Sequence, residues 1–158
     1  MTAPSPFAGR GVTPAAGQAA YCPAMSAEPG HAIVSWHAHV YFDPATTRLH
    51  AQRVRDAIAR RFRVQLGRWH EVPIGPHTQA MYQVAFDVGV FAALVPWLAL
   101  HREGLSVLVH PNTLAPRADH LVHALWLGPP LPLRPEVLPD SIAAADESPI
   151  VPNTIPDC

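Results

Sequence analysis

The sequence predicts an α+β domain, a ferredoxin-like βαββαβ sheet with two helices on one face and an additional C-terminal strand. Three observations support this fold class. Strand-like and helix-like segments follow one another in that order, and proline, glycine or capping residues separate them. The length of 158 residues is enough for one hydrophobic core but not for two.

The first strand, the first helix and the second strand come before a proline-glycine loop. IVSWHAHVYF at 33–42 is rich in aromatic and β-branched residues and predicts a strand. Asp43 and Pro44 predict a helix start, because a carboxylate accepts hydrogen bonds from free N–H groups and proline is preset for the first turn. We expect this helix to end near Arg61 and FRVQLGRW at 62–69 to form the second strand.

The second half of the domain repeats the alternation. Apolar residues at helical spacing follow Asp87, and Pro96 within them predicts a kink. The expected elements are a loop at 70–77, a strand at 79–86, a helix after Asp87, a strand at 105–110 and a strand at 123–128.

Both ends of the chain differ in composition from the domain at 31–133. Residues 1–30 are rich in Ala, Pro, Gly and Ser, and residues 134–158 are rich in proline. Neither segment has a regular apolar period, so neither has enough apolar surface to offset the entropy of ordering. We expect a flexible N-terminal tail and a C-terminal tail that is loose or draped over the domain.

The charge and the cysteine content exclude several classes of protein. Eleven arginines, no lysine and twelve acidic residues give a formal net charge of -1, so neither nucleic acid nor a membrane surface is an expected partner. The two cysteines, Cys22 and Cys158, do not make a disulfide framework. No apolar run has the length of a membrane span and no export signal is visible, so we expect a cytoplasmic protein.

Ten histidines are concentrated in the middle of the chain, and two of them share one strand. Side chains of a strand alternate between its faces. The apolar side chains from Val34 to Phe42 are therefore expected under the helices, whereas Ser35, His37, His39 and Tyr41 are expected on the opposite, open face.

Other histidines are predicted to converge on this face. If the first and third strands are central and parallel, and the second and fourth run opposite to them, then four strand ends meet at one end of the sheet. These ends carry His37, His70 with Glu71, His77, and His110; the segment DHLVH at 119–123 adds Asp119, His120 and His123 from the rim.

Imidazoles and a carboxylate around an open position are typical of a catalytic divalent metal. Such a ligand set is expected for iron or zinc, and two histidines with one carboxylate facing open positions favour non-haem iron that activates oxygen. For a single carboxylate such as Glu71 or Asp119, a hydrogen-bonded structural role is the commoner case. The same holds for histidines outside the convergent set, such as His31, His50 and His101.

Four sequence blocks resemble the DOPA 4,5-dioxygenase family. They are WHAHVYFD, GRWHEVPIGPHTQAMYQVAF, VPWLALHREGLSVLVHPNT and DHLVHALWLG, within a similarity from about His31 to Gly128. The resemblance implies an Fe(II) extradiol dioxygenase whose substrates are a catechol and O₂. With L-DOPA, 4,5-cleavage would give a muconic semialdehyde that cyclises to betalamic acid.

Roles for the site residues follow from the expected strand arrangement. We assign His37, His77 and His110 as metal ligands and Glu71 as the carboxylate ligand. His39 is a catalytic group or an alternative ligand, and His123 or His120 is the acid/base that moves the catechol proton.

Two other functions stay open. The first is a non-catalytic metal- or small-ligand-binding protein of the same fold, a homodimer through the open sheet face. The second is a zinc hydrolase, which the absence of an HExxH motif disfavours.

Overall fold

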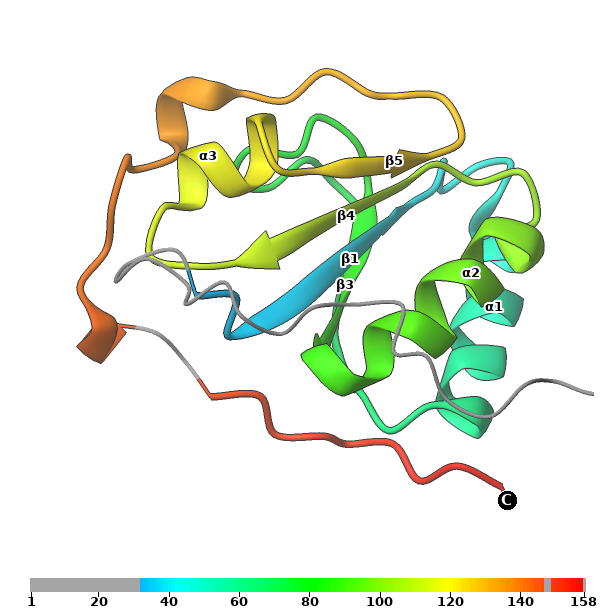
Figure 1. Cartoon of the computed structure of the whole chain (residues 1–158). Helices are drawn as coiled ribbons and strands as arrows, with labels where there is room; N and C mark the ends of the chain where they lie inside the picture. The colour runs from blue at the N-terminus through cyan, green and yellow to red at the C-terminus, as the bar shows by residue number, and fades with distance from the viewer. Residues whose placement is uncertain (1–31, 147–148, 158) are drawn as a thin grey trace, which may run out of the picture.

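The computed structural model describes residues 32–146 and 149–157, so the predicted N-terminal tail, His31, Cys22 and Cys158 lie outside the described residues. Five strands form one sheet in the order β2-β3-β1-β4-β5, and every neighbouring pair is antiparallel. The strands are β1 (Ser35–Tyr41), β2 (Gln65–His70), β3 (Met81–Asp87), β4 (Val107–Asn112) and β5 (Leu125–Leu127) (Figure 1). The predicted α+β class is confirmed.

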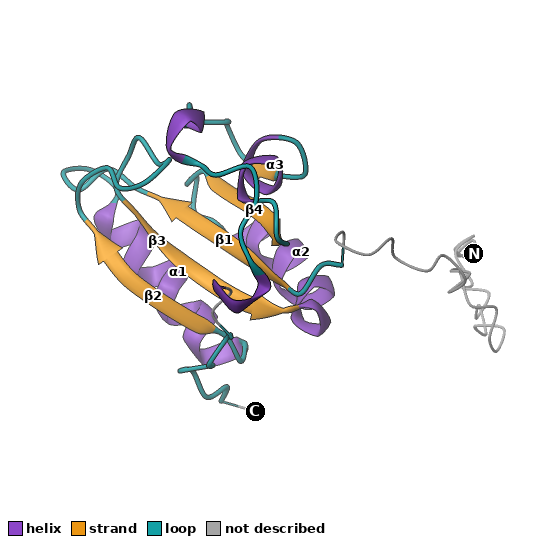
Figure 2. Ribbon diagram, turned by 90° about the vertical axis from the view of Figure 1, so that its left-hand side faces the viewer, coloured by secondary structure: helices purple, strands orange, loops and turns teal. Residues whose placement is uncertain are grey.

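Two helices, α1 (Arg48–Arg61) and α2 (Phe91–His101), lie on one face of the sheet, behind the strands in Figure 2. The third helix, α3 (Pro116–Leu121), was not predicted and lies on the other side. Short 3-10 helices complete the chain at Val88–Val90 (η1), Pro135–Val137 (η2) and Ala144–Asp146 (η3).

The first helix begins later than predicted. Asp43 does not cap α1; its side chain accepts a hydrogen bond from the Ala45 N–H at 2.8 Å. The Asp43 carbonyl accepts another from the Thr47 N–H at 2.9 Å. These bonds close a turn over residues 44–47, and the helix continues from Arg48 to the predicted end at Arg61.

The main core lies between the sheet and the two long helices. Ala38, Val40 and Phe42 of the first strand segment are buried there, and Trp36 packs against the same cluster, as the alternation predicts. The helices contribute their own apolar face to this core: Ala51, Val54, Ile58, Leu94, Val95 and Leu98. The helix-facing side is therefore predicted correctly from Trp36 to Phe42, whereas Val34 lies before β1 and is exposed.

The opposite face of the sheet is not open. Tyr41, Met81 and Leu108 form a second buried cluster there, and Trp126, Leu131 and Leu133 pack against it. In Figure 1 the chain after β4 lies on this side of the sheet as α3 and, after the edge strand β5, as the following segment. A layer of chain, rather than solvent, covers the polar face of β1.

The predicted direction of the third strand relative to the first is wrong. β1 and β3 are antiparallel, with Tyr41 opposite Met81 and Ser35 opposite Asp87. The end of β2 therefore lies beside the end of β1, since His70 is also opposite Met81. His70 and the start of β3 lie at one end of the sheet, and the start of β1 lies at the other.

The C-terminal segment covers the free edge of β2. The Asn153 carboxamide accepts a hydrogen bond from the Leu66 N–H at 2.8 Å and donates one to the Leu66 carbonyl at 3.0 Å. The Asn153 backbone N–H donates to the Val64 carbonyl at 3.0 Å, and the Thr154 hydroxyl accepts from the Val64 N–H at 2.8 Å. These bonds occupy backbone groups that an edge strand would otherwise offer to another chain.

In the described part of the chain, none of the helices combines the length and the apolar character needed to cross a bilayer.

Replacement of Asn153 tests whether this segment stabilises the fold. Asn153→Ala removes two hydrogen bonds and is expected to lower the free energy of unfolding by about 1 to 2 kcal/mol. Ile155→Ala is the control, because Ile155 is 88% exposed and should change stability by less than about 0.5 kcal/mol. Urea denaturation measures the free energy of unfolding of both variants. Equal values would show that the two Asn153 side-chain hydrogen bonds do not stabilise the fold.

Candidate metal centre

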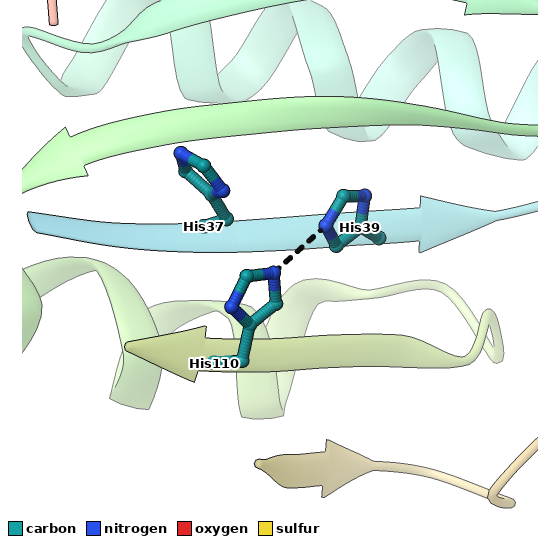
Figure 3. Close-up of side chains that lie close together, drawn as sticks. All are labelled: His37, His39 and His110. Carbon is teal, nitrogen blue, oxygen red and sulfur yellow. Dashed lines mark hydrogen bonds between the residues drawn. The ribbon is translucent and has the colours of Figure 1, made fainter. Parts of the chain in front are cut away.

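Five histidines meet on the covered face of the sheet. His37 and His39 come from β1 and His110 from the neighbouring strand β4 (Figure 3). His77 comes from the loop before β3, and His120 comes from α3. His37 and His110 are directly opposite each other in the β1–β4 pair, so strand register alone places two imidazoles side by side.

The rings are in close contact. The centroids of His39 and His77 are 4.1 Å apart, and those of His110 and His120 are 3.8 Å apart. His37 lies edge-on to His110 at 5.2 Å. Two overlapping triads have nitrogen atoms that all lie within 4.8 Å of one another: His37, His39 and His110, and His39, His77 and His120.

Hydrogen bonds define the protonated nitrogen of two rings. The Nδ1 of His110 lies 2.7 Å from the Pro111 carbonyl, which can only accept, so this Nδ1 carries the proton. In a neutral ring the His110 Nε2 is then an acceptor. It lies 3.1 Å from the His39 Nε2, which must donate (Figure 3).

One fully buried ring nitrogen is left without a partner among the described residues. Since the His39 Nε2 carries the proton, the His39 Nδ1 has a lone pair; it is buried and accepts no hydrogen bond from the described residues. A buried unsatisfied polar atom costs about 1 to 3 kcal/mol. A bound cation would offset that cost.

Two further rings are oriented from outside the cluster. The Nδ1 of His120 donates to the Pro116 carbonyl at 2.8 Å, which leaves its Nε2 as an acceptor. The Tyr41 hydroxyl lies 2.7 Å from the Nδ1 of His77. Tyr41 also stacks on Trp126, with centroids 5.7 Å apart, so the tyrosine is held between the site and β5.

Burial keeps these imidazoles uncharged. Loss of hydration lowers the pKa of His37 to about 4 and that of His77 to about 3. The pKa values of His39 and His110 fall well below the usual value for the same reason, with the neighbouring histidines adding to the effect. Neutral imidazole is the form that binds a metal, so the donor set fits a divalent cation.

Two predicted site residues are not part of the cluster. Glu71 accepts a hydrogen bond from the Arg48 Nε at 3.0 Å in an exposed ion pair at the other end of the loop. His123 is exposed and lines a separate cavity with Trp36 and Ala118. Neither of the two triads includes a carboxylate.

Asp119 has a structural role that explains the position of α3. Its carboxylate is buried and accepts hydrogen bonds from the Thr113 backbone N–H and hydroxyl, both at 2.9 Å. This pairing closes the turn between β4 and α3. It thereby holds His120, the next residue, over the sheet.

The sequence pattern did not lead to a functional role for Tyr41, although strand alternation predicts its face. Tyr41 is two residues beyond His39, so strand alternation places it on the histidine face. The contact with His77 depends on the loop conformation, which the sequence pattern did not specify.

A cavity of about 250 Å³ adjoins the cluster. Its walls are formed by His37, Gln65, Gln83, Ala85, Asn112, Ile142, Asp146, Pro149 and Ile150. Because His37 belongs to both, a small molecule in this cavity would touch the first triad directly.

The chain is similar to several known proteins. A 34% identical DOPA 4,5-dioxygenase of Amanita muscaria aligns over 75% of this chain and 54% of its own length. An uncharacterized 21.2 kDa protein of Botryotinia fuckeliana is 40% identical, over 52% of this chain and 50% of its own length. The chain thus spans about half the length of both curated relatives.

A solved structure and a family model extend the similarity. The crystal structure of a candidate dioxygenase from Nostoc punctiforme is 55% identical, with a TM-score of 0.65 over 66% of this chain and 90% of that chain. The model of the Dopa 4,5-dioxygenase family matches residues 36–137, which contain all five histidines of the cluster. The chain belongs to the Dopa 4,5-dioxygenase family.

Proposed function

We propose that the protein is a non-haem iron(II) extradiol dioxygenase that cleaves the ring of L-DOPA or a related catechol. The observation that carries the proposal is the cluster of five uncharged imidazoles, three of them buried, beside a cavity in a chain of the Dopa 4,5-dioxygenase family. In the proposed reaction the ring carbon–carbon bond next to the two hydroxyls breaks. Both atoms of O₂ enter the muconic semialdehyde, which with L-DOPA cyclises to betalamic acid.

We assign the metal to His37, His39 and His110. His39 has a buried Nδ1 without a partner among the described residues, and His37 lines the cavity. The unprotonated Nε2 of His110 accepts the hydrogen bond from the His39 Nε2, so a metal bound at the His110 Nε2 would replace that bond. Bound iron(II) supplies a Lewis acid for the catechol oxygens and a redox partner for O₂. The carboxylate expected from the sequence is absent from this triad, so the proposed ligand set consists of imidazoles alone.

The remaining two histidines are suited to moving protons. The Nδ1 of His120 is bonded to the Pro116 carbonyl, so its free Nε2 can accept the catechol proton. Burial raises the pKa of Tyr41, whose hydroxyl therefore stays protonated. We assign the Tyr41 hydroxyl as the donor to the His77 Nδ1, its one partner among the described residues, which would place the proton of His77 on Nε2.

His77 and His120 thus differ in role although both are neutral histidines. His120 has an acceptor nitrogen and can serve as a base, whereas His77 has a donor nitrogen and can return a proton to the opened ring. This assigns His77 to proton transfer instead of the metal ligation expected from the strand arrangement. The second triad, His39, His77 and His120, is the competing metal site.

We also infer that the fold is ferredoxin-like. The element order β1-α1-β2-β3-α2-β4 and the strand order β2-β3-β1-β4 support this, with β5 added at the outer edge of β4. The face proposed for dimer contact is covered by the chain itself, and the homodimer remains a prediction.

Removal of the metal tests the reaction class. Protein stripped with a chelator should lose catechol-dependent oxygen uptake and recover it when iron(II) is added without oxygen. Zinc(II) should not restore oxygen uptake, because zinc(II) does not change its oxidation state. An oxygen electrode and the yellow colour of the semialdehyde report the reaction, and full activity in the metal-free protein would contradict the proposal.

Single replacements distinguish the two triads. His37→Ala and His110→Ala should lower bound iron at least about tenfold, as expected on loss of a ligand. His77→Ala and His120→Ala should keep the iron while turnover falls about 10²- to 10⁴-fold, the usual contribution of proton transfer. Metal analysis and oxygen uptake measure the two quantities separately.

His123→Ala and Glu71→Gln are the matched controls, since both residues lie outside the cluster and should retain iron and turnover. If His77→Ala and His120→Ala lose the metal while His37→Ala keeps it, the ion belongs to the second triad.

A further inference from the structure

The cavity beside His37 has a polar floor made by the sheet. Gln65 and Ala85 are opposite each other in the β2–β3 pair, and Gln83 is opposite His39 in the β1–β3 pair. All lie on the histidine face of the sheet, because Tyr82 and Val84 between them belong to the main core. Ala85 is opposite His37, and its small side chain leaves space above the strand.

One carboxamide of the floor is free to bind a ligand. Gln65 is engaged, because its Oε1 accepts a hydrogen bond from the Val151 N–H at 2.8 Å. Gln83 makes no side-chain hydrogen bond to any described residue, although it lies in the cavity wall next to His39. Its amide can therefore pair with a polar group of a molecule in the cavity.

The wall opposite the sheet comes from the C-terminal segment. Ile142, Pro149 and Ile150 provide apolar surface, and Asp146 provides a carboxylate. The Asp146 backbone is held by a hydrogen bond from its N–H to the Ala143 carbonyl at 2.9 Å, within the short helix η3. Among the described residues that line the cavity, Asp146 is the one acidic residue, and none is an arginine or a lysine.

We propose that this cavity holds the substituent of the catechol and selects a substituent with an ammonium group, with Asp146 as the specificity-determining residue. The identity of the bound molecule as a catechol substrate rests on the proposed function. The preference of the cavity for an ammonium group does not. The ring would lie towards His37, the apolar residues would contact the connecting carbons, and the ammonium would lie between the Asp146 carboxylate and the Gln83 amide oxygen. A carboxylate at that position would meet a like charge.

Equilibrium binding to the metal-free protein tests the charge preference without any turnover. The probes are tyramine, which is cationic, 4-ethylphenol, which is neutral, and 4-hydroxyphenylacetate, which is anionic. Wild-type protein should bind tyramine about three- to fivefold more tightly than 4-ethylphenol, the size expected for a partly exposed ion pair. It should bind 4-hydroxyphenylacetate least.

Asp146→Asn should remove the difference between tyramine and 4-ethylphenol. Asp140→Asn is the matched control: Asp140 is another carboxylate of the same segment, but it pairs with Arg117 and its side chain is 91% exposed. The preference should be unchanged in that variant. Equal binding of all three probes by the wild type, or an unchanged preference in Asp146→Asn, would overturn the inference.

Oxygen uptake by the iron-loaded protein separates this inference from the proposed function. Dopamine should be used at a higher kcat/KM than 3,4-dihydroxyphenylacetate, and Asp146→Asn should reduce that ratio mainly through KM. A protein that prefers tyramine but consumes no catechol would refute the proposed reaction and keep the cavity assignment. Turnover of both catechols with the same kcat/KM would refute the assignment alone.

Discussion

Five uncharged imidazoles, three of them buried, are packed together on one face of the sheet, and the organisation of the chain around them follows from this packing. Charged imidazoles packed this closely would repel one another and lose their hydration, and the lowered pKa values express that cost. A neutral ring has one donor and one acceptor, so each hydrogen bond to a ring determines what its other nitrogen can do. The Pro111 and Pro116 carbonyls fix two rings with acceptor nitrogens facing the cluster.

The same constraint explains why the second half of the chain is organised as it is. Alternation along β1 gives one apolar face for α1 and α2 and one polar face that needs a cover of its own. That cover is α3 and the segment after β5, held by Asp119 and by the Arg134 N–H bond to the Pro76 carbonyl at 2.9 Å. It excludes water from the imidazoles while the cavity at His37 keeps one side accessible.

The sequence predicted those features that depend on local pattern. Strand alternation placed His37 and His39 on one face and the apolar residues on the other, and it placed His110 on the histidine face of its strand. Pattern does not determine strand direction, so the expected parallel pair of the first and third strands was wrong. That error did not remove His77 from the site, because its loop folds back over the end of β1 to reach Tyr41.

Residues whose partners are distant in sequence were the hardest to predict. Glu71 looks like a ligand beside His70, but Arg48 from α1 engages it. The C-terminal tail has no apolar period, yet it is ordered through side chains that bind the β2 backbone, as Asn153 does. Periodicity predicts which faces are apolar. It does not predict single polar side chains that hydrogen-bond to an edge strand in the place of a neighbouring strand.

A crystal structure of the iron-loaded protein, with an anomalous difference map at the iron absorption edge, would locate the metal. One peak is expected within bonding distance of nitrogen atoms of His37, His39 and His110, and none at Glu71 or His123. A peak bonded to His77 and His120 instead, or no iron peak in this face of the sheet, would contradict the proposed site.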